Sequence, residues 1–178
     1  SIGRGILSSL GYSAESLEDS FYIAIFDVDR IDRMDMNAEE DGVMRVVYLP
    51  TVVADYNGSV ENNGAMRAHL HGCSGIDGVT FGPDFGAAKD STRYLHVAYG
   101  VYSDLERTDN DYQVILKYDV DELRANSAVL KQDNMHDVGP APRAKYFAYT
   151  GNTNFGVQNF EYDPFTEKYW MAVYTGKK

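Results

Sequence analysis

The sequence is poor in cysteine, tryptophan and proline, with one Cys, one Trp and five Pro in the whole chain. A single cysteine, Cys73, excludes any disulfide within the chain. It leaves the redox compartment open, because many larger secreted domains also fold without disulfides. An extracytoplasmic location is the expectation that we favour.

The sequence also lacks long apolar runs and an excess of basic residues. No stretch approaches the length of a membrane helix, and no basic segment followed by an apolar one marks an uncleaved signal peptide. With 16 basic against 27 acidic residues, the net charge of -11 argues against a nucleic-acid partner. The chain starts at Ser1 and stops just after the strand-like run "YWMAVYTGKK", so we expect a fragment of a larger protein.

Aromatic residues and glycine are abundant. The chain is 44% hydrophobic and 13% aromatic, with fourteen Tyr and sixteen Gly. Aromatic side chains suit half-buried strands, and glycine suits tight turns. The composition therefore predicts an all-β fold.

Two short patterns recur along the chain. "GIDGVTFGP" at 75–83 matches "GVQNFEYDP" at 156–164, with every position at one constant offset. "FYIAIFD", "YLHVAYG" and "YWMAVYT" follow one another at nearly equal spacing, and each starts with an aromatic residue that recurs five positions later. Such spacing predicts successive supersecondary units, approximately 1–70, 71–151 and an incomplete 152–178.

The central unit contains four strand-like segments and one helical one. We predict strands at 76–82, 93–102, 112–119 and 145–150, and one or two helical turns in "DELRANSAVL" capped by Asp121. Four antiparallel strands per unit are typical of a β-propeller blade, so the chain would supply two to three blades of a partial propeller. A β-sandwich or an irregular barrel is the alternative.

Four segments carry a resemblance to a known group. "GIDGVTFGP", "YLHVAYGVY", "DNDYQVILKYD" and "GNTNFGVQNFEYDP" resemble blades of bacterial β-propeller proteins with lactonase-like or NHL-like repeats, over about residues 70–176. The resemblance implies open strand edges that the remainder of the propeller or other copies of the chain would close, since a closed propeller needs at least four blades. It transfers no catalytic residue.

Two segments have side chains that could bind metal. In "HLHGC", alternating His69, His71 and Cys73 would share one face of an extended strand and could hold Zn²⁺, with His96 or His136 completing the site. The acidic segment 27–41, which includes Asp27 and Asp29, could collect oxygen ligands for Ca²⁺, although it lacks the EF-hand spacing. A hydrogen-bonded strand end and a solvated acidic loop are the simpler interpretations, and we favour them.

A ligand site is expected where the inner strands of a propeller meet the central channel. The residues expected to face or flank that channel are polar: His71, Asp77, Asn152, Gln158 and Asn159. They could bind a small polar molecule or a glycan, or they could simply hydrogen-bond across the channel. The recurring tyrosines at 94, 99, 169 and 174 are expected to pack between blades rather than to stack on sugars.

Three functions follow from these features. The leading hypothesis is a binding module for a small polar ligand or glycan. The second is a metal-dependent hydrolase of the lactonase or esterase kind, with Asp77, His71 or the acidic segment activating water; it rests on fold analogy. The third is a protein–protein interaction module that uses the acidic surface and the open strand edges.

Overall fold

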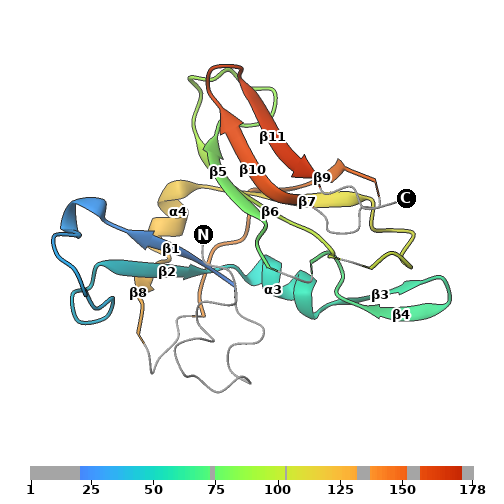
Figure 1. The fold of residues 1–178 in the computed structure, drawn as a ribbon, viewed down its shortest axis with the longest axis horizontal. Helices are drawn as coiled ribbons and strands as arrows, with labels where there is room; N and C mark the ends of the chain where they lie inside the picture. Colours follow the sequence, from blue (N-terminus) through green and yellow to red (C-terminus); the bar gives the residue numbers. More distant parts are fainter. Residues whose placement is uncertain (1–20, 73–74, 103, 132–136, 152–156, 174–178) are drawn as a thin grey trace.

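The computed structural model describes residues 21–72, 75–102, 104–131, 137–151 and 157–173. Strands predominate, and they form several antiparallel sheets, so the predicted all-β class is confirmed (Figure 1). The strands are β1 (Tyr22–Phe26), β2 (Met44–Tyr48), β3 (Ser59–Asn62), β4 (Ala65–Ala68), β5 (Gly78–Gly82), β6 (Tyr94–Tyr99), β7 (Tyr112–Tyr118), β8 (Ala128–Val129), β9 (Ala144–Tyr149), β10 (Val157–Asp163) and β11 (Lys168–Val173). The helical segments are η1 (Val28–Arg30), α3 (Pro50–Asn57) and α4 (Val120–Ala125).

The central sheet contains four antiparallel strands in the order β5-β6-β7-β9. These are the four strands predicted for the central unit, and their order in the sheet follows their order along the chain. The inner strands β6 and β7 are buried along nearly their whole length, whereas β9 has only half-buried and exposed residues. Both faces of the sheet are therefore covered near β6, and the β9 side is more open.

The hairpin of β10 and β11 covers one face of this sheet, with β10 alongside β5 (Figure 1). A Cβ atom on Gly78 would stand 2.5 Å from the backbone nitrogen of Phe160, so only glycine permits this approach. The Thr80 hydroxyl accepts a hydrogen bond from the Tyr162 backbone N–H at 3.0 Å. Ala98, Ile115 and Phe160 form the core between the two layers.

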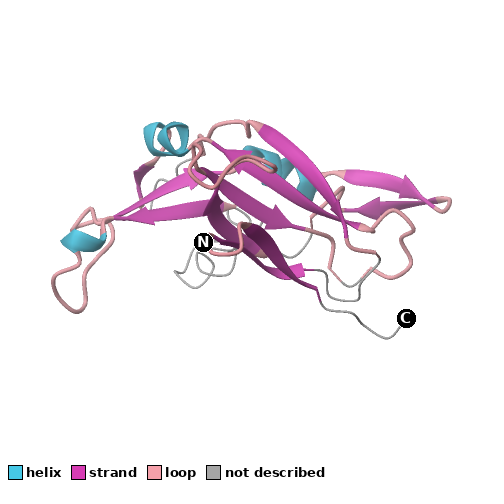
Figure 2. Ribbon diagram, turned by 90° about the horizontal axis from the view of Figure 1, so that it is seen from above, coloured by secondary structure: helices cyan, strands magenta, loops and turns pink. Residues whose placement is uncertain are grey.

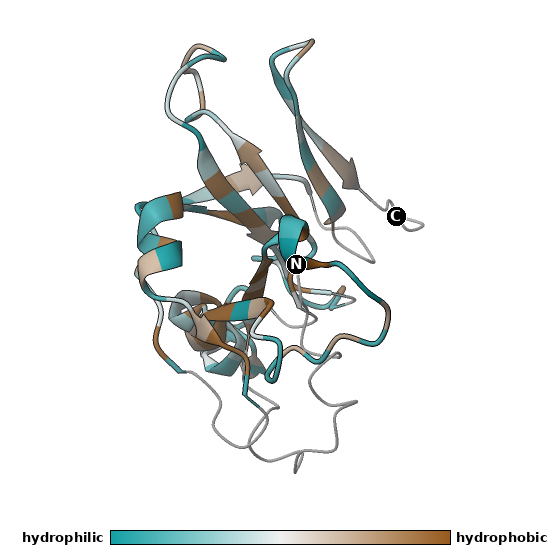
Figure 3. Cartoon of the chain, turned by 90° about the vertical axis from the view of Figure 1, so that its left-hand side faces the viewer, coloured by the Kyte–Doolittle hydropathy of each residue, from teal (hydrophilic) through white to brown (hydrophobic). Residues whose placement is uncertain are grey.

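The opposite face packs against a second sheet, ordered β1-β2-β8, and against α3. The larger core lies here, and its most deeply buried members include Val47, Leu49, Val97, Tyr99, Leu116 and Tyr118. Hydrophobic residues concentrate on the strands, while the turns that join them are mostly hydrophilic (Figure 3). Strand β8 follows β7 in sequence yet pairs with β2, so the sheet of the first unit includes a segment from the second.

The helix predicted in "DELRANSAVL" is present as α4, but it begins earlier than expected. Asp119 is the N-cap, and its carboxylate accepts hydrogen bonds from the backbone N–H groups of Asp121 and Glu122. Asp121 lies inside the first turn, so its predicted capping role is wrong. Asp119 has the extended backbone that an N-cap requires, with φ -70° and ψ 129°.

The pairing registers of the β5–β6 and β10–β11 hairpins show which residues of the repeated segments are structurally equivalent. Gly78 pairs with Ala98 in one hairpin, and Asn159, its counterpart in the repeat, pairs with Ala172 in the other. Ala98 and Ala172 are thus equivalent, and counting back along both strands makes Leu95 the equivalent of Tyr169. The aromatic pattern in the sequence had instead aligned Tyr94 with Tyr169. A shift by one residue places side chains on opposite faces of a strand, so Tyr94 and Tyr169 do not play equivalent packing roles.

Two segments project at opposite ends of the long axis, the loop around η1 and the β3–β4 hairpin (Figure 2).

Within the described part of the chain, no helix has the length and apolar character needed to cross a membrane.

Candidate functional site

Residues 69–72, the described part of "HLHGC", do not form the extended strand that we predicted. Strand β4 ends at Ala68, and His69 has a φ of 69°, in the left-handed region. This conformation breaks the alternation that would have aligned His69 with His71, because the strand period no longer applies. Nδ1 of His69 lies 2.6 Å from the Tyr56 carbonyl oxygen. Cys73 and His136 lie outside the described residues, and His96 is buried on β6, under the β10–β11 hairpin.

Among the described residues, no three His, Cys, Asp or Glu side chains gather closely enough to hold a metal ion. In the acidic segment, the Asp27 carboxylate accepts a hydrogen bond from the Asp29 backbone N–H and caps η1. Arg33 donates to the Asp41 carboxylate at 2.5 Å, and this hydrogen bond lowers the pKa of Asp41. The contacts of these acids are thus to their own loop.

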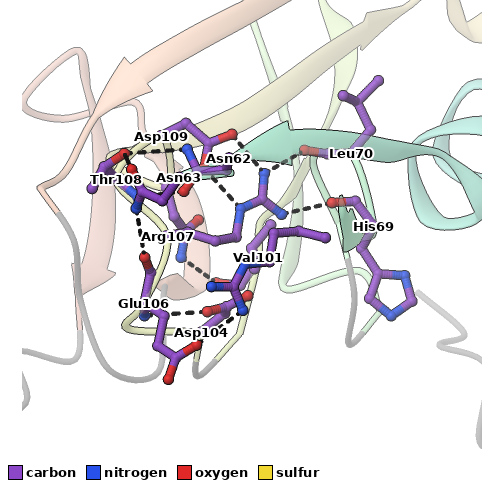
Figure 4. A network of polar contacts seen from close by, with 12 residues as sticks. Asn62, Asn63, His69, Leu70, Val101, Asp104, Glu106, Arg107, Thr108 and Asp109 are labelled. Carbon is purple, nitrogen blue, oxygen red and sulfur yellow. Dashed lines mark hydrogen bonds and ion pairs between the residues drawn. The ribbon is translucent and has the colours of Figure 1, made fainter. Parts of the chain in front are cut away.

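Arg107 joins the segment after β4 to the loop between β6 and β7 (Figure 4). Its guanidinium donates to the backbone carbonyls of His69 at 2.6 Å and Leu70 at 3.0 Å. It also donates to both carboxylate oxygens of Asp109, at 2.8 and 3.0 Å. The residue is only 2% exposed, so these bonds are shielded from water and fix the two segments against each other.

A second set of contacts holds the β3–β4 hairpin to the same loop. The amide of Asn62 donates to the Thr108 hydroxyl at 3.2 Å, and the Thr108 backbone N–H donates back to Asn62 at 3.1 Å. Arg67 pairs with Glu106 at 2.9 Å on the exposed side. The loop from Glu106 to Asp109 is therefore supported along its length by β3, β4 and the residues that follow them.

Next to these contacts lies a cavity of about 270 Å³, just below the roughly 300–1,000 Å³ of typical small-molecule pockets. It opens at the end of the central sheet where β6 stops and β7 starts. Its lining combines aliphatic, aromatic, charged, amide and imidazole groups: Leu70, His71, Val101, Arg107, Asp109, Asn110, Tyr112 and Phe147. Hereafter we refer to this cavity as the His71 pocket.

Exposed aromatic rings extend from the wall of the His71 pocket across two neighbouring strands. Tyr112 on β7 is 49% exposed, and Phe147 and Tyr149 on β9 are 50% and 73% exposed. Tyr112 pairs directly with Tyr149 across the strands, and their rings meet edge to face at 5.5 Å. We call these three residues the aromatic rim. Groups of large aromatic side chains on a protein surface are characteristic of binding sites.

A buried ion pair lies close to the pocket. Asp55, on α3, is only 4% exposed. Its carboxylate accepts hydrogen bonds from the Lys145 ammonium at 2.6 and 2.9 Å. The hydroxyl of Tyr99 donates to the same carboxylate at 2.5 Å. Burial lowers the pKa of His71, and the nearby Asp55 charge only partly opposes this, so the imidazole is neutral at pH 7.

Asp77 lies at the same end of the sheet but does not line the pocket. Its carboxylate accepts a hydrogen bond from the Gln113 amide at 2.9 Å and another from the Gly100 backbone N–H. Burial raises the pKa of Asp77 to about 7, although both hydrogen bonds act to lower it. The carboxyl group therefore changes charge near neutral pH.

Three of the five expected channel residues are described, and they make separate contacts. His71 lines the pocket, Asp77 bonds to Gln113, and Asn159 is exposed on β10. Asn152 and the side chain of Gln158 lie outside the described residues. Asn110, Tyr112 and Phe147 also line the pocket, and we did not predict them from the sequence. The signal available for the aromatic residues was the alternation in "AKYFAY", which places Phe147 and Tyr149 on one face of a strand.

Searches against models of known protein families, curated proteins and solved structures found no match to this chain.

Proposed function

We propose that this chain is a binding module for a sugar or a similar small polyhydroxylated ligand, held in the His71 pocket. The observation that carries the proposal is the aromatic rim beside a pocket with several kinds of polar group. One face of a sugar ring presents C–H groups that pack on aromatic side chains, while its hydroxyls need hydrogen-bond partners. A ligand of this kind would use both parts of the site.

The polar groups around the pocket suit hydroxyl groups, each of which both donates and accepts. The neutral imidazole of His71 has one donor and one acceptor nitrogen, and the Asn110 amide also has both. The Asp109 carboxylate accepts only, and Arg107 lowers its pKa by hydrogen bonding, so it stays ionised at neutral pH. Since Arg107 also fixes the loop, little ordering is needed when a ligand binds.

We further propose that the central sheet is a blade of a β-propeller. In support, its four antiparallel strands follow the chain order, and the next hairpin stacks face to face upon it with β10 nearest β5. The His71 pocket lies beside β7 and the outermost strand β9. In such a propeller the ligand would therefore bind at the outer side of a blade, not at the channel mouth that the sequence suggested.

The test is isothermal titration calorimetry against a panel of neutral mono- and oligosaccharides. Tyr112→Ala should weaken binding of the best saccharide about tenfold, because an aromatic contact of this kind contributes on the order of 1 kcal/mol or more. Phe165→Ala is the matched control: Phe165 is an aromatic residue, 95% exposed, in the β10–β11 turn, and this substitution should leave the affinity unchanged. Equal affinity in the two variants, or no binding by any saccharide, would overturn the proposal.

A further inference from the structure

A second, mainly apolar groove of about 270 Å³ lies between β1 and β5. In the described part of the chain, β1 and β5 are edge strands of two different sheets, each with a hydrogen-bonding partner on one side. The groove therefore marks a place where the two sheets pack without pairing. The β1–β5 groove, as we call it, is lined by residues of β1, β5, β6 and α4: Ile23, Ala24, Ile25, Phe26, Val79, Phe81, Leu95, Val120, Leu123 and Arg124.

The lining of the β1–β5 groove ranges from buried to half-exposed. Ile23 and Leu95 are 6% and 3% exposed and belong to the larger core, so the deepest part of the groove is fixed by core packing. Phe26 and Phe81 are 50% and 53% exposed, an unusual state for phenylalanines beside a core. An apolar ligand in the groove would cover these two rings and so remove apolar surface from water.

One end of α4 adds a positive charge to this apolar lining. Arg124 is the one charged residue among the described residues of the groove, and its side chain is 69% exposed. Its guanidinium lies 3.8 Å from the carboxylate of Asp121, which is itself 94% exposed, so this ion pair is weak. Leu123, only 3% exposed, anchors the helix on the core and thereby fixes the position of the neighbouring Arg124.

We propose that the β1–β5 groove binds a free medium-chain carboxylic acid, with its alkyl chain along the apolar lining and its carboxylate on Arg124. The guanidinium selects this head group because its planar fork can donate two parallel hydrogen bonds to a carboxylate. The volume sets the chain length. With roughly 30 Å³ for each methylene, about the space of one water molecule in the liquid, the groove holds about nine carbons.

A series of straight-chain carboxylates from hexanoate to dodecanoate tests the apolar part of the site. Isothermal titration calorimetry, at concentrations below those at which the ligands form micelles, should show one binding site. The affinity should rise about fourfold with each added methylene, which is about 0.8 kcal/mol, because each buries one more CH₂ group. The rise should level off at about nine carbons, where the groove is full.

The head group is tested by comparing octanoate with the uncharged octan-1-ol. Arg124→Gln should weaken octanoate about fivefold and leave octan-1-ol unchanged, because the lost contact requires an anion. Lys89→Gln is the matched control. It removes a cation that is 51% exposed in the loop between β5 and β6 and does not line the groove, so it should leave both affinities unchanged. Asp121→Asn should bind octanoate at least as tightly as the unmodified chain, since it removes a carboxylate that competes for Arg124.

The location is tested at Phe81, whose half-exposed ring can be shortened with little effect on folding. Phe81→Ala should weaken octanoate and octan-1-ol alike, about fivefold, and Phe165→Ala, in the exposed β10–β11 turn, should weaken neither. Affinity that does not depend on chain length, or an equal effect of Arg124→Gln and Lys89→Gln on octanoate, would overturn the proposal. A dimer in light scattering that Phe81→Ala dissociates would also overturn it, by assigning the groove to a second copy of the chain.

Discussion

Two buried titratable side chains, Asp77 and His96, respond to pH in opposite directions. His96 is fully buried among the rings of Phe85, Phe160 and Tyr169, and burial lowers its pKa to about 4. In the unfolded chain the pKa of His96 is higher, near 6.5, so the unfolded chain binds the proton first. The free energy of unfolding therefore falls as pH falls from about 6.5 towards 4. For Asp77 the native pKa is about 7 and the unfolded value about 4. Its ionisation therefore destabilises the fold as pH rises between those two values.

Asp77→Asn should stabilise the protein above pH 7 and have little effect below pH 4. The amide keeps an oxygen to accept the Gln113 hydrogen bond, and it removes the cost of burying a charge. The gain at pH 8 should be about 2 to 4 kcal/mol, since one pKa unit corresponds to about 1.4 kcal/mol. Urea unfolding at several pH values between 4 and 8 measures it.

Asp121→Asn is the matched control, because the Asp121 side chain is 94% exposed on α4 and should give no comparable trend with pH. A gain in Asp77→Asn that is the same at pH 4 and pH 8 would show that the carboxyl group is not the titrating group.

At the scale of elements, Asp55 connects three separate parts of the fold. It lies on α3, bonds to Tyr99 on β6, and pairs with Lys145 on β9. Asp55→Ala should lower the free energy of unfolding by about 3 kcal/mol or more, because it leaves a lysine and a tyrosine hydroxyl without their partner in a largely buried position.

Chemical denaturation followed by the fluorescence of Trp170 or by circular dichroism measures this effect. Asp121→Ala, at an exposed site, should change stability by less than about 0.5 kcal/mol. A similarly small change in Asp55→Ala would show that the ion pair does not hold α3 to the sheet.

The strands of the central unit were predictable because local signals agreed. Apolar runs such as "YLHVAY" and "YQVILKY" are separated by loops rich in Gly, Asp and Ser, and both features are read within a short window of sequence. The pairing of β8 with β2 was not predictable in this way. Arg45 and Val129 pair although they lie far apart in the sequence, and only tertiary packing selects such a partner.

At the scale of the whole molecule, the site depends on packing that the sequence does not display. His71 was identified from its residue type, but its expected partners, His69 and Cys73, were chosen by a strand period that the left-handed backbone at His69 breaks. Tyr112 and Phe147 resemble core residues in sequence. They are half-exposed because, in the described part of the chain, neither the β1-β2-β8 sheet nor the β10–β11 hairpin covers this end of β7 and β9.

The most direct test of sugar binding at the His71 pocket is a crystal structure of the chain with the tightest-binding saccharide. We predict a sugar ring packed on Tyr112 or Phe147, with hydroxyls within hydrogen-bonding distance of the side chains of His71, Asn110 or Asp109. A saccharide bound elsewhere, with this pocket empty, would contradict it.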